Sequence, residues 1–284
     1  MHDLNGRVAL VTGAGGGVGR ALTDSLAAEG MALSLLDVDG DSLAATAQAV
    51  RDSGGGVHVR TTVVDVADAV AVAAAVSATV EQFGSVDLLC SNAGILRPGA
   101  VWEQPPEVWA RIVGVNLLGT VNLVAAALPH MLERGAGHIV MTIGATALFT
   151  APFSPPGSYA VSKHALLAYA ETLFEELTVL NAPVGVSVLC PTGVRSAIAG
   201  TPAVADGEVI RRPEIWRRVE ALRASIANGI DPAELAGLAV QAVRDNRFWV
   251  FPDASIPARA LHRADYISRA ADPTGPPIGV SAAT

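Results

Sequence analysis

The chain has 284 residues, of which 51% are hydrophobic and 16% are charged, and its mean hydropathy is +0.41. This apolar content excludes a mainly disordered protein, and the formal net charge of −8 argues against nucleic-acid binding, which requires a basic surface. The first residues lack a basic segment ahead of an apolar one, and Gly, Asp or Pro interrupts each apolar run before it reaches bilayer length. We therefore expect a cytoplasmic protein without a signal peptide or a membrane span.

The cysteines and histidines form no metal-binding pattern. Cys90 and Cys190 each end an apolar run, which predicts buried, reduced thiols rather than a disulfide. Neither the CxxC nor the HExxH spacing occurs in the chain. We expect no metal site.

Short apolar runs alternate with longer, Ala-rich segments along most of the chain. The predicted strands are Arg7–Thr12, Ala32–Leu36, His58–Val64, Val86–Cys90, His138–Ile143, Gly185–Cys190 and Phe248–Phe251. Most of them are continuous Val, Ile or Leu, as expected for strands that are covered on both faces. The predicted helices between them include Gly19–Glu29, Asp41–Asp52, Ala67–Phe83, Trp109–Met131 and Ser158–Leu180. This order predicts an α/β fold with a doubly wound parallel sheet of about seven strands and helices on both faces.

Residues 1–271 form one predicted domain, because no linker-like segment interrupts them. Residues 199–212 break the alternation between the sixth strand and a helix, and we expect a substrate lid around residues 199–230. The sequence DPTGPPIGVSAAT at residues 272–284 predicts a flexible C-terminal tail.

The first predicted strand ends in a glycine-rich turn, TGAGGGVG, which spans Thr12–Gly19. Glycines there permit positive φ and close backbone approach, and the helix that follows presents free N–H groups to a pyrophosphate. The spacing is Gly-x-x-x-Gly-x-Gly, at Gly13, Gly17 and Gly19, rather than GxGxxG. A flexible surface loop is the alternative, but the flanking strand and helix favour a nucleotide site that includes Val18.

Asp37 directly follows the second predicted strand. A carboxylate at that position can accept hydrogen bonds from the adenosine ribose hydroxyls and repels a 2′-phosphate, so it favours NAD over NADP. A helix cap is the alternative role for Asp37. Asp65 and Val66 follow the third strand and are placed to meet the adenine edge.

Tyr159 and Lys163 are four residues apart in a predicted helix, which puts both side chains on one face. Lys163 is the only lysine among 19 basic residues, so a chain that otherwise uses arginine has an ammonium at this one position. A phenol is a poor base at neutral pH, and an adjacent cation lowers its pKa by stabilising the phenolate. The alternative is an incidental helical pair, but the single lysine favours a catalytic pair.

Together these motifs resemble the short-chain dehydrogenase/reductase family over about Gly6 to Pro252. The family's Asn-Asn-Ala-Gly segment has Ser91 at its first position here, and its Pro-Gly-x-Val-x-Thr segment has Thr192 in place of Gly. The further positions that match the family's cofactor-binding or catalytic residues are Asn92, Ala93, Gly94, Asn116, Val194 and Ser196. The resemblance implies a single-domain Rossmann-like fold that binds NAD.

The resemblance also implies the role of each catalytic residue. Tyr159 is expected to exchange a proton with the substrate oxygen, and Lys163 to bind the nicotinamide ribose and lower the tyrosine pKa. Asn116 is expected to hold a water that connects Lys163 to solvent. Homodimers or homotetramers occur in the family, and the apolar helices Trp109–Met131 and Ser158–Leu180 make self-association plausible here.

The serine that the family places at the end of the fifth strand is not conserved in this chain. The apolar pattern of the strand aligns Gly144 with that position, whereas the spacing from Tyr159 aligns Thr146 with it. Thr146 is one expected hydrogen-bond donor, and Thr142 or Ser154 is another. If the donor is missing, the loss is about 2.7–4 kcal/mol of transition-state stabilisation, which slows an enzyme without silencing it.

The expected substrate walls are mostly apolar. They comprise Phe149, Pro152 and Phe153, the Leu96–Trp102 loop, and the Ala199–Trp216 region. These residues favour a hydrophobic secondary alcohol or ketone over an acid, although they could instead cover the core or an interface. Two rival functions remain: a non-catalytic NAD-binding sensor or scaffold, and an NADP-dependent ketone reductase.

Overall fold

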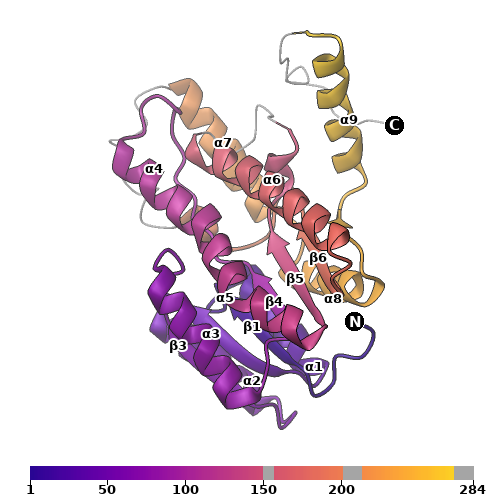
Figure 1. The fold of residues 1–284 in the computed structure, drawn as a ribbon. Coiled ribbons are helices and arrows are strands. Elements are labelled where there is room, and N and C mark those ends of the chain that lie inside the picture. The colour runs from indigo at the N-terminus through magenta and orange to yellow at the C-terminus, as the bar shows by residue number, and fades with distance from the viewer. Residues whose placement is uncertain (150–156, 201–212, 272–284) are drawn as a thin grey trace.

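Seven parallel strands form one sheet in the computed structural model, which describes residues 1–149, 157–200 and 213–271 (Figure 1). The strands are β1 (Val8–Thr12), β2 (Ala32–Asp37), β3 (Val59–Val63), β4 (Leu88–Ser91), β5 (Gly137–Thr142), β6 (Val184–Leu189) and β7 (Trp249–Val250). Their order across the sheet is β3-β2-β1-β4-β5-β6-β7. The predicted doubly wound sheet is confirmed, although β7 is shorter than its predicted range.

Helices cover both faces of the sheet. They are α1 (Gly17–Ala28), α2 (Gly40–Asp52), α3 (Ala69–Phe83), α4 (Pro106–Val113), α5 (Gly119–Arg134), α6 (Ser158–Val179), α7 (Pro213–Ala227), α8 (Pro232–Asp245) and α9 (Ser255–Ser268). Residues of α1, α2 and α8 share one apolar cluster with the strands, and residues of α3, α5 and α6 share another on the opposite face. The helix α9 extends away from this layered body in Figure 1.

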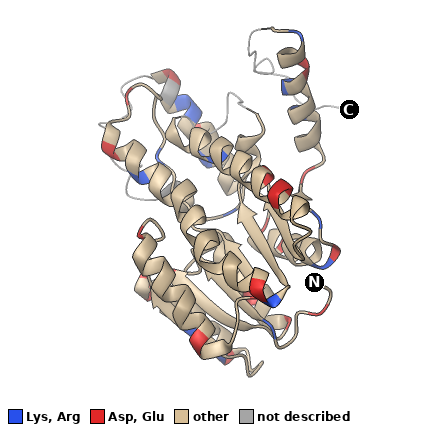
Figure 2. Ribbon diagram, in the orientation of Figure 1, with Lys and Arg blue, Asp and Glu red and all other residues tan. Residues whose placement is uncertain are grey.

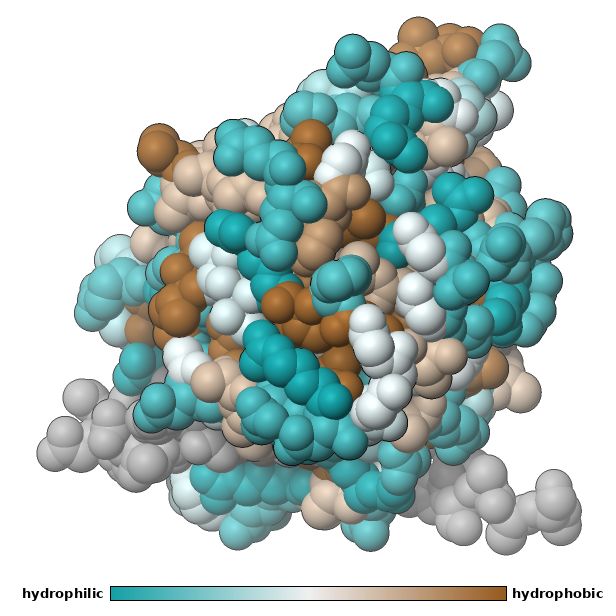
Figure 3. Space-filling view, turned by 90° about the horizontal axis from the view of Figure 1, so that it is seen from below, coloured by the Kyte–Doolittle hydropathy of each residue, from teal (hydrophilic) through white to brown (hydrophobic). Residues whose placement is uncertain are grey.

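The continuous apolar runs of the strands reflect burial on both faces. In β1, Leu10 packs in the cluster with α3, α5 and α6, while its neighbours Ala9 and Val11 pack in the cluster with α1, α2 and α8. All three side chains are fully buried. The charged residues lie mainly on helices and connecting segments (Figure 2), and the face seen from below carries hydrophilic side chains around smaller apolar areas (Figure 3).

Side-chain caps begin several helices. Asp39 accepts hydrogen bonds from the backbone of α2, and Asp68 does the same for α3. The helix α3 ends at Gly84, whose φ of 85° lies in the left-handed region that glycine adopts without strain. The caps Asp39 and Asp68 therefore define where α2 and α3 begin, after the carboxyl ends of β2 and β3.

The helical run Pro106–Arg134 is longer than the predicted Trp109–Met131. Among the described residues it is the one helix long and apolar enough to cross a membrane, so the expectation that each apolar run is interrupted earlier was wrong here. Gly114 and Gly119 lie within the run rather than ending it. In the most apolar 18-residue window, 44% of the residues are buried inside the protein. Core packing against the sheet therefore accounts for much of this apolar surface.

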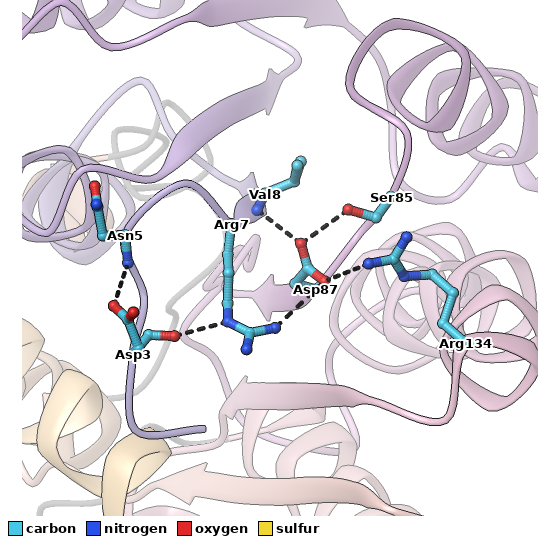
Figure 4. A network of polar contacts seen from close by, with 7 residues as sticks. All are labelled: Asp3, Asn5, Arg7, Val8, Ser85, Asp87 and Arg134. Atoms are coloured by element: carbon cyan, nitrogen blue, oxygen red, sulfur yellow. Dashed lines mark hydrogen bonds and ion pairs between the residues drawn. The ribbon is translucent and has the colours of Figure 1, made fainter.

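A buried carboxylate joins elements at the amino ends of the strands (Figure 4). Asp87 is 3% exposed and accepts hydrogen bonds from the Val8 backbone N–H at 2.9 Å and from the Ser85 hydroxyl at 2.8 Å. Arg7 and Arg134 pair with its other oxygen at 3.9 and 3.4 Å. The network ties β1, β4 and the end of α5 together.

Both cysteines are free thiols within the core, as predicted. Burial raises the pKa of Cys90 to about 12, and burial raises the pKa of Cys190 to about 12 as well. Neither thiol is therefore poised as a nucleophile near neutral pH.

Candidate active site

A cavity of about 430 Å³ opens at the carboxyl ends of the strands, beside the point where the strand order reverses between β1 and β4. This is the position where open α/β sheets bind ligands, and its size is typical of a small-molecule site. The predicted site residues that line it are Gly13, Gly17, Val18, Asp37, Asp65, Val66, Asn92, Ala93, Gly94, Thr146, Tyr159, Lys163, Val194 and Ser196. Gly19 and Asn116 lie outside the lining and support the wall.

The glycine turn forms a backbone cradle at one end of the cavity. Gly13 and Gly17 have φ values of 65° and 52°. A Cβ on Gly19 would lie 1.9 Å from the carbonyl oxygen of Gly13, so only glycine allows α1 to start this close to β1. No side chain among residues 1–149, 157–200 and 213–271 caps α1, which leaves its first N–H groups and its positive dipole end for an anion. The turn therefore fits a dinucleotide pyrophosphate.

Asp37 lies in the cavity wall at the end of β2. Its carboxylate accepts hydrogen bonds from the backbone N–H of Gly15 at 2.8 Å and of Asp39 at 3.0 Å. These contacts fix the carboxylate between the glycine turn and α2. Asp39, not Asp37, caps α2, so the capping alternative for Asp37 was wrong. The carboxylate is placed to accept ribose hydroxyls and to repel a phosphate.

Asp65 and Val66 line the cavity after β3. The Asp65 carboxylate accepts a hydrogen bond from Ala67 N at 3.0 Å and forms an ion pair with Arg111 of α4. Sequence reasoning did not find Arg111, which also lines the cavity. Arg111 lies within the predicted helix Trp109–Met131, and the sequence does not indicate that this helix face meets the end of β3.

A chain of hydrogen bonds links the strands beneath the cavity to the lysine. The Asn92 side-chain nitrogen donates a hydrogen bond to the Thr12 carbonyl oxygen at 3.1 Å, and the Thr142 hydroxyl donates to Asn92 Oδ1 at 3.0 Å. The Thr142 carbonyl in turn accepts the Lys163 ammonium at 2.7 Å. Lys163 is 3% exposed. The chain's one lysine is thus buried in the cavity wall, with its ammonium bonded to the last residue of β5.

Tyr159 and Lys163 lie on one face of α6, with Lys163 Nζ 5.8 Å from the centroid of the tyrosine ring. Burial raises the pKa of Tyr159 to about 12, and burial lowers the pKa of Lys163 to about 8. Desolvation of the phenol is the cause of this rise, and the effect of Lys163 on the tyrosine pKa stays a prediction. Tyr159 is therefore a protonated phenol at neutral pH.

Asn116 lies in a π-helical turn, Gly114–Leu118, between α4 and α5. Asn116 is fully buried. Its side-chain oxygen accepts a hydrogen bond from Ile95 N–H, and its side-chain nitrogen donates to the Ile95 carbonyl and to the Ser162 hydroxyl. A Cβ on Gly94 would be 3.5 Å from Asn116 Oδ1 and 3.7 Å from Lys163 Nζ. Asn116 thus ties the loop after β4 to α6 beside the lysine. The π-turn, which often marks functional sites, carried no signal in the sequence.

Gly144 and Thr146, the two positions that the alignments offered for the family serine, lie beside each other. A Cβ on Gly144 would be 3.7 Å from Thr146 Oγ1 and 4.0 Å from the Tyr159 hydroxyl oxygen. The Thr142 hydroxyl is engaged by Asn92. Ser154 lies outside the described residues. Of the candidates that are described, Thr146 has its hydroxyl in the cavity wall without a hydrogen-bond partner.

The other end of the cavity is apolar. Tyr159 packs there against Leu96, Ile198, Leu222 and Ile226. The last two residues belong to α7, which forms the described part of the predicted lid; residues 201–212 lie outside the described part of the chain, as do Pro152, Phe153 and the predicted tail at 272–284.

Phe149 does not line the cavity, contrary to expectation. It packs with Ala145 and Ile256 in a separate apolar cluster, and the Arg259 guanidinium lies 5.6 Å from its ring centroid. The start of α9 therefore covers this side chain. The sequence did not indicate this contact, because Ile256 and Arg259 are more distant from Phe149 along the chain than any local pattern reaches.

The segment after β6 closes the cavity on the side of α7. Val194 forms a parallel bridge with Ile230, and Arg195 forms an ion pair with Asp231 at the start of α8. A Cβ on Gly17 would be 3.1 Å from the Ser196 Cβ, so this segment also reaches the glycine turn. The segment that matches the family's Pro-Gly-x-Val-x-Thr motif thus contacts both the start of α8 and the glycine turn.

The comparisons with known proteins agree with this geometry. A family model described as short chain dehydrogenase matches residues 7–203. The chain is 32% identical to the 1-deoxy-11-beta-hydroxypentalenate dehydrogenase of Streptomyces exfoliatus over 95% of this chain and 90% of that protein. It is 30% identical to the CLA biosynthesis dehydrogenase/reductase of Lactiplantibacillus plantarum over 88% and 89% of the two chains.

A similar fold is found in the crystal structure of a short-chain dehydrogenase/reductase from Burkholderia phymatum in complex with NAD. That structure has a TM-score of 0.89 and 34% sequence identity, and the match covers 97% of this chain and 99% of that one. Solved structures similar to this chain include complexes with NAD and with NADP-type cofactors. The chain belongs to the short-chain dehydrogenase/reductase family of oxidoreductases, whose members use a nicotinamide cofactor.

Proposed function

We propose that the protein is an NAD-dependent oxidoreductase that interconverts hydrophobic secondary alcohols and ketones. The observation that carries this proposal is the position of its only lysine. Lys163 is 3% exposed and lies one helical turn from Tyr159, in the wall of a cavity that begins at a glycine cradle. A chain with 19 basic residues and one lysine places that ammonium beside a phenol at the ligand site.

Tyr159 is the proton carrier in this proposal. As a phenol it donates a proton to the oxygen of a ketone that is being reduced, and as a phenolate it accepts the proton of an alcohol that is being oxidised. The Lys163 ammonium stabilises the phenolate and donates to the nicotinamide ribose. The bound nicotinamide supplies or accepts the hydride. Asn116 holds the loop after β4 against α6, and so keeps Lys163 and Tyr159 in register.

The choice of NAD rests on Asp37. Its carboxylate is fixed in the cavity wall by two backbone N–H groups, and Val38, which also lines the cavity, supplies no cation for a 2′-phosphate. The dehydrogenase from Burkholderia phymatum that is 34% identical was solved with NAD. Both observations support NAD and disfavour the NADP-dependent ketone reductase.

The substrate class follows from the apolar end of the cavity. Leu96, Ile143, Ile198, Leu222 and Ile226 line it around Tyr159. None of these five described side chains is charged, so a charged substituent would lose its hydration against them without gaining an ionic partner from them. The name of the Streptomyces exfoliatus relative describes the dehydrogenation of an 11-beta-hydroxy carboxylate, so it supports the alcohol chemistry of this proposal and not the uncharged substituents. A secondary alcohol with apolar substituents suits these walls.

The experiment is a panel of apolar secondary alcohols with NAD and the matching ketones with NADH, followed by NADH absorbance. We expect turnover by the wild type and by Tyr169→Phe, a control ten positions further along α6, and a loss of about 10²–10⁴-fold in kcat for Tyr159→Phe. Equal inactivity of the wild type and Tyr159→Phe, with tight NAD binding by both, would establish the non-catalytic NAD-binding sensor or scaffold instead.

We also propose that a second copy of the chain docks on the faces of α5 and α6, as a homodimer or as part of a homotetramer. An apolar groove lies between these helices and is lined by Leu128, Leu132 and Leu173 among others. Leu132 lines the groove and is 39% exposed, and Phe174 of α6, which packs against Phe248, is 41% exposed. Light scattering of the wild type and of Phe174→Asp tests this: a monomeric wild type contradicts it.

A further inference from the structure

The turn that follows β5 contains a buried hydroxyl without a partner. Thr146 Oγ1 is buried in the cavity wall and makes no hydrogen bond within the described part of the chain. An unsatisfied buried polar group costs about 1–3 kcal/mol, so its presence in a native site calls for a ligand or another role. Ser158 Oγ is also buried without a partner, but Ser158 does not line the cavity.

The Thr146 hydroxyl and the Tyr159 hydroxyl flank the same space. A Cβ built on Gly144 would lie 3.7 Å from the first oxygen and 4.0 Å from the second. Gly144 has no side chain to occupy that space, and the surrounding walls are apolar. Two hydroxyls that face one opening can both donate to a single substrate oxygen.

The backbone of Gly144 explains why the donor is not at position 144 itself. Its φ of 88° and ψ of 150° lie in a region that is essentially confined to glycine. A serine at this position would be strained by its own backbone. The turn is held there because Gly144 N donates to Leu189 O and Ala145 N donates to Pro191 O.

The short 3-10 helix Ala145–Ala147 then brings Thr146 to the cavity. Ala145 and Ala147 are each 2% exposed and pack into the core on either side. The threonine between them is the one residue of this helix with a polar side chain. The turn therefore places one hydroxyl in the site and buries its neighbours.

We infer that Thr146 is a catalytic residue that donates a hydrogen bond to the reacting oxygen, and that glycine at position 144 is required for the turn that delivers it. This inference rests on the proposed function. In ketone reduction the hydride adds to the carbonyl carbon, the C=O π electrons move to oxygen, and the oxygen takes its proton from Tyr159. Thr146 keeps its own proton throughout and stabilises the negative charge that develops on the oxygen.

Three variants test the inference with a ketone and NADH. Thr146→Val removes the hydroxyl while keeping the shape, and we expect kcat to fall by about 10²–10³-fold with the Kd for NADH unchanged. Thr146→Ser keeps the hydroxyl and should retain kcat within about 10-fold of the wild type. Adding Gly144→Ser to Thr146→Val should not restore kcat, because the serine is disfavoured by the backbone at that position.

The outcomes separate this inference from the proposed function. An active wild type whose kcat is unchanged in Thr146→Val overturns the role of Thr146 and leaves the proposed function intact. A loss of activity in both Thr146→Val and Thr146→Ser, with a matching loss of thermal stability, also overturns it, because the residue then acts only in packing. A wild type that binds NADH but turns over nothing in the panel overturns the proposed function, and this inference with it.

Discussion

Replacement of Gly19 by alanine tests the glycine cradle most sharply. The added Cβ would lie 1.9 Å from the Gly13 carbonyl oxygen and 2.8 Å from the Asn92 side-chain nitrogen. Ordinary van der Waals contact begins near 3.4 Å, so the Gly13 backbone must retreat by roughly 1.5 Å. The atom in the way is backbone, and no side-chain rotation can relieve the contact.

Two effects of different size oppose each other in this variant. Alanine in place of glycine within a helix gains about 1 kcal/mol, whereas overpacking costs about 1–3 kcal/mol and occasionally more. We therefore expect Gly19→Ala to lower the free energy of unfolding, despite the better helix former. A displacement of more than 1 Å in a binding cradle can cost about 10²-fold, so the Kd for NADH should rise by about 10–100-fold.

Gly237→Ala is the matched control. Gly237 is also within a helix, α8, but a Cβ there meets nothing within 4 Å. We expect this variant to be at least as stable as the wild type and to bind NADH equally well. Urea unfolding and NADH fluorescence titration measure both properties. If Gly19→Ala matches Gly237→Ala in both assays, the close approach of α1 to β1 is not what forms the cradle.

Three further outcomes are expected. Asp37→Ala should shift the ratio of the Kd values for NADPH and NADH towards NADPH by at least about 10-fold, about 1.4 kcal/mol; an unchanged ratio in fluorescence titrations contradicts the role of this carboxylate. Burial lowers the pKa of Lys163 from 10.5 to about 8, so between these pH values the folded state binds fewer protons than the unfolded state. The free energy of unfolding of the wild type should therefore rise with pH over that range relative to that of Lys163→Met. Parallel pH profiles of the two proteins in urea unfolding would argue against this shift. Asp87→Ala leaves Val8 N–H and the Ser85 hydroxyl without their acceptor and should cost about 1–3 kcal/mol in urea unfolding, with kcat per folded molecule unchanged; a variant as stable as the wild type contradicts the bridging role of Asp87.

The strands and the cofactor cradle could be predicted from the sequence because each depends on a local pattern. Buried parallel strands are continuous apolar runs, and the glycine spacing reports a strand, a turn and a helix N-terminus together. Asp37 was predictable for the same reason, since it ends β2 directly. In each case, residues that are close together in the sequence are also close together in the cavity wall.

Long-range contacts could not be predicted in this way. Arg111 reaches Asp65 from a helix 46 residues away along the chain, and Leu222 and Ile226 meet Tyr159 only because α7 folds back over the site. The serine position was ambiguous because two alignments differed by two residues. The positive φ of Gly144 is a property of the backbone that neither alignment could reveal.

A single-turnover reaction of the NADH complex with an accepted ketone tests the central claim, that Tyr159 is the proton carrier. NADH absorbance is followed after mixing for the wild type, Tyr159→Phe and Tyr169→Phe, with the Kd for NADH measured for each protein. We expect equal NADH affinity in all three, and a hydride-transfer rate that falls by about 10²–10⁴-fold in Tyr159→Phe alone. A Tyr159→Phe rate equal to that of the wild type would contradict the account.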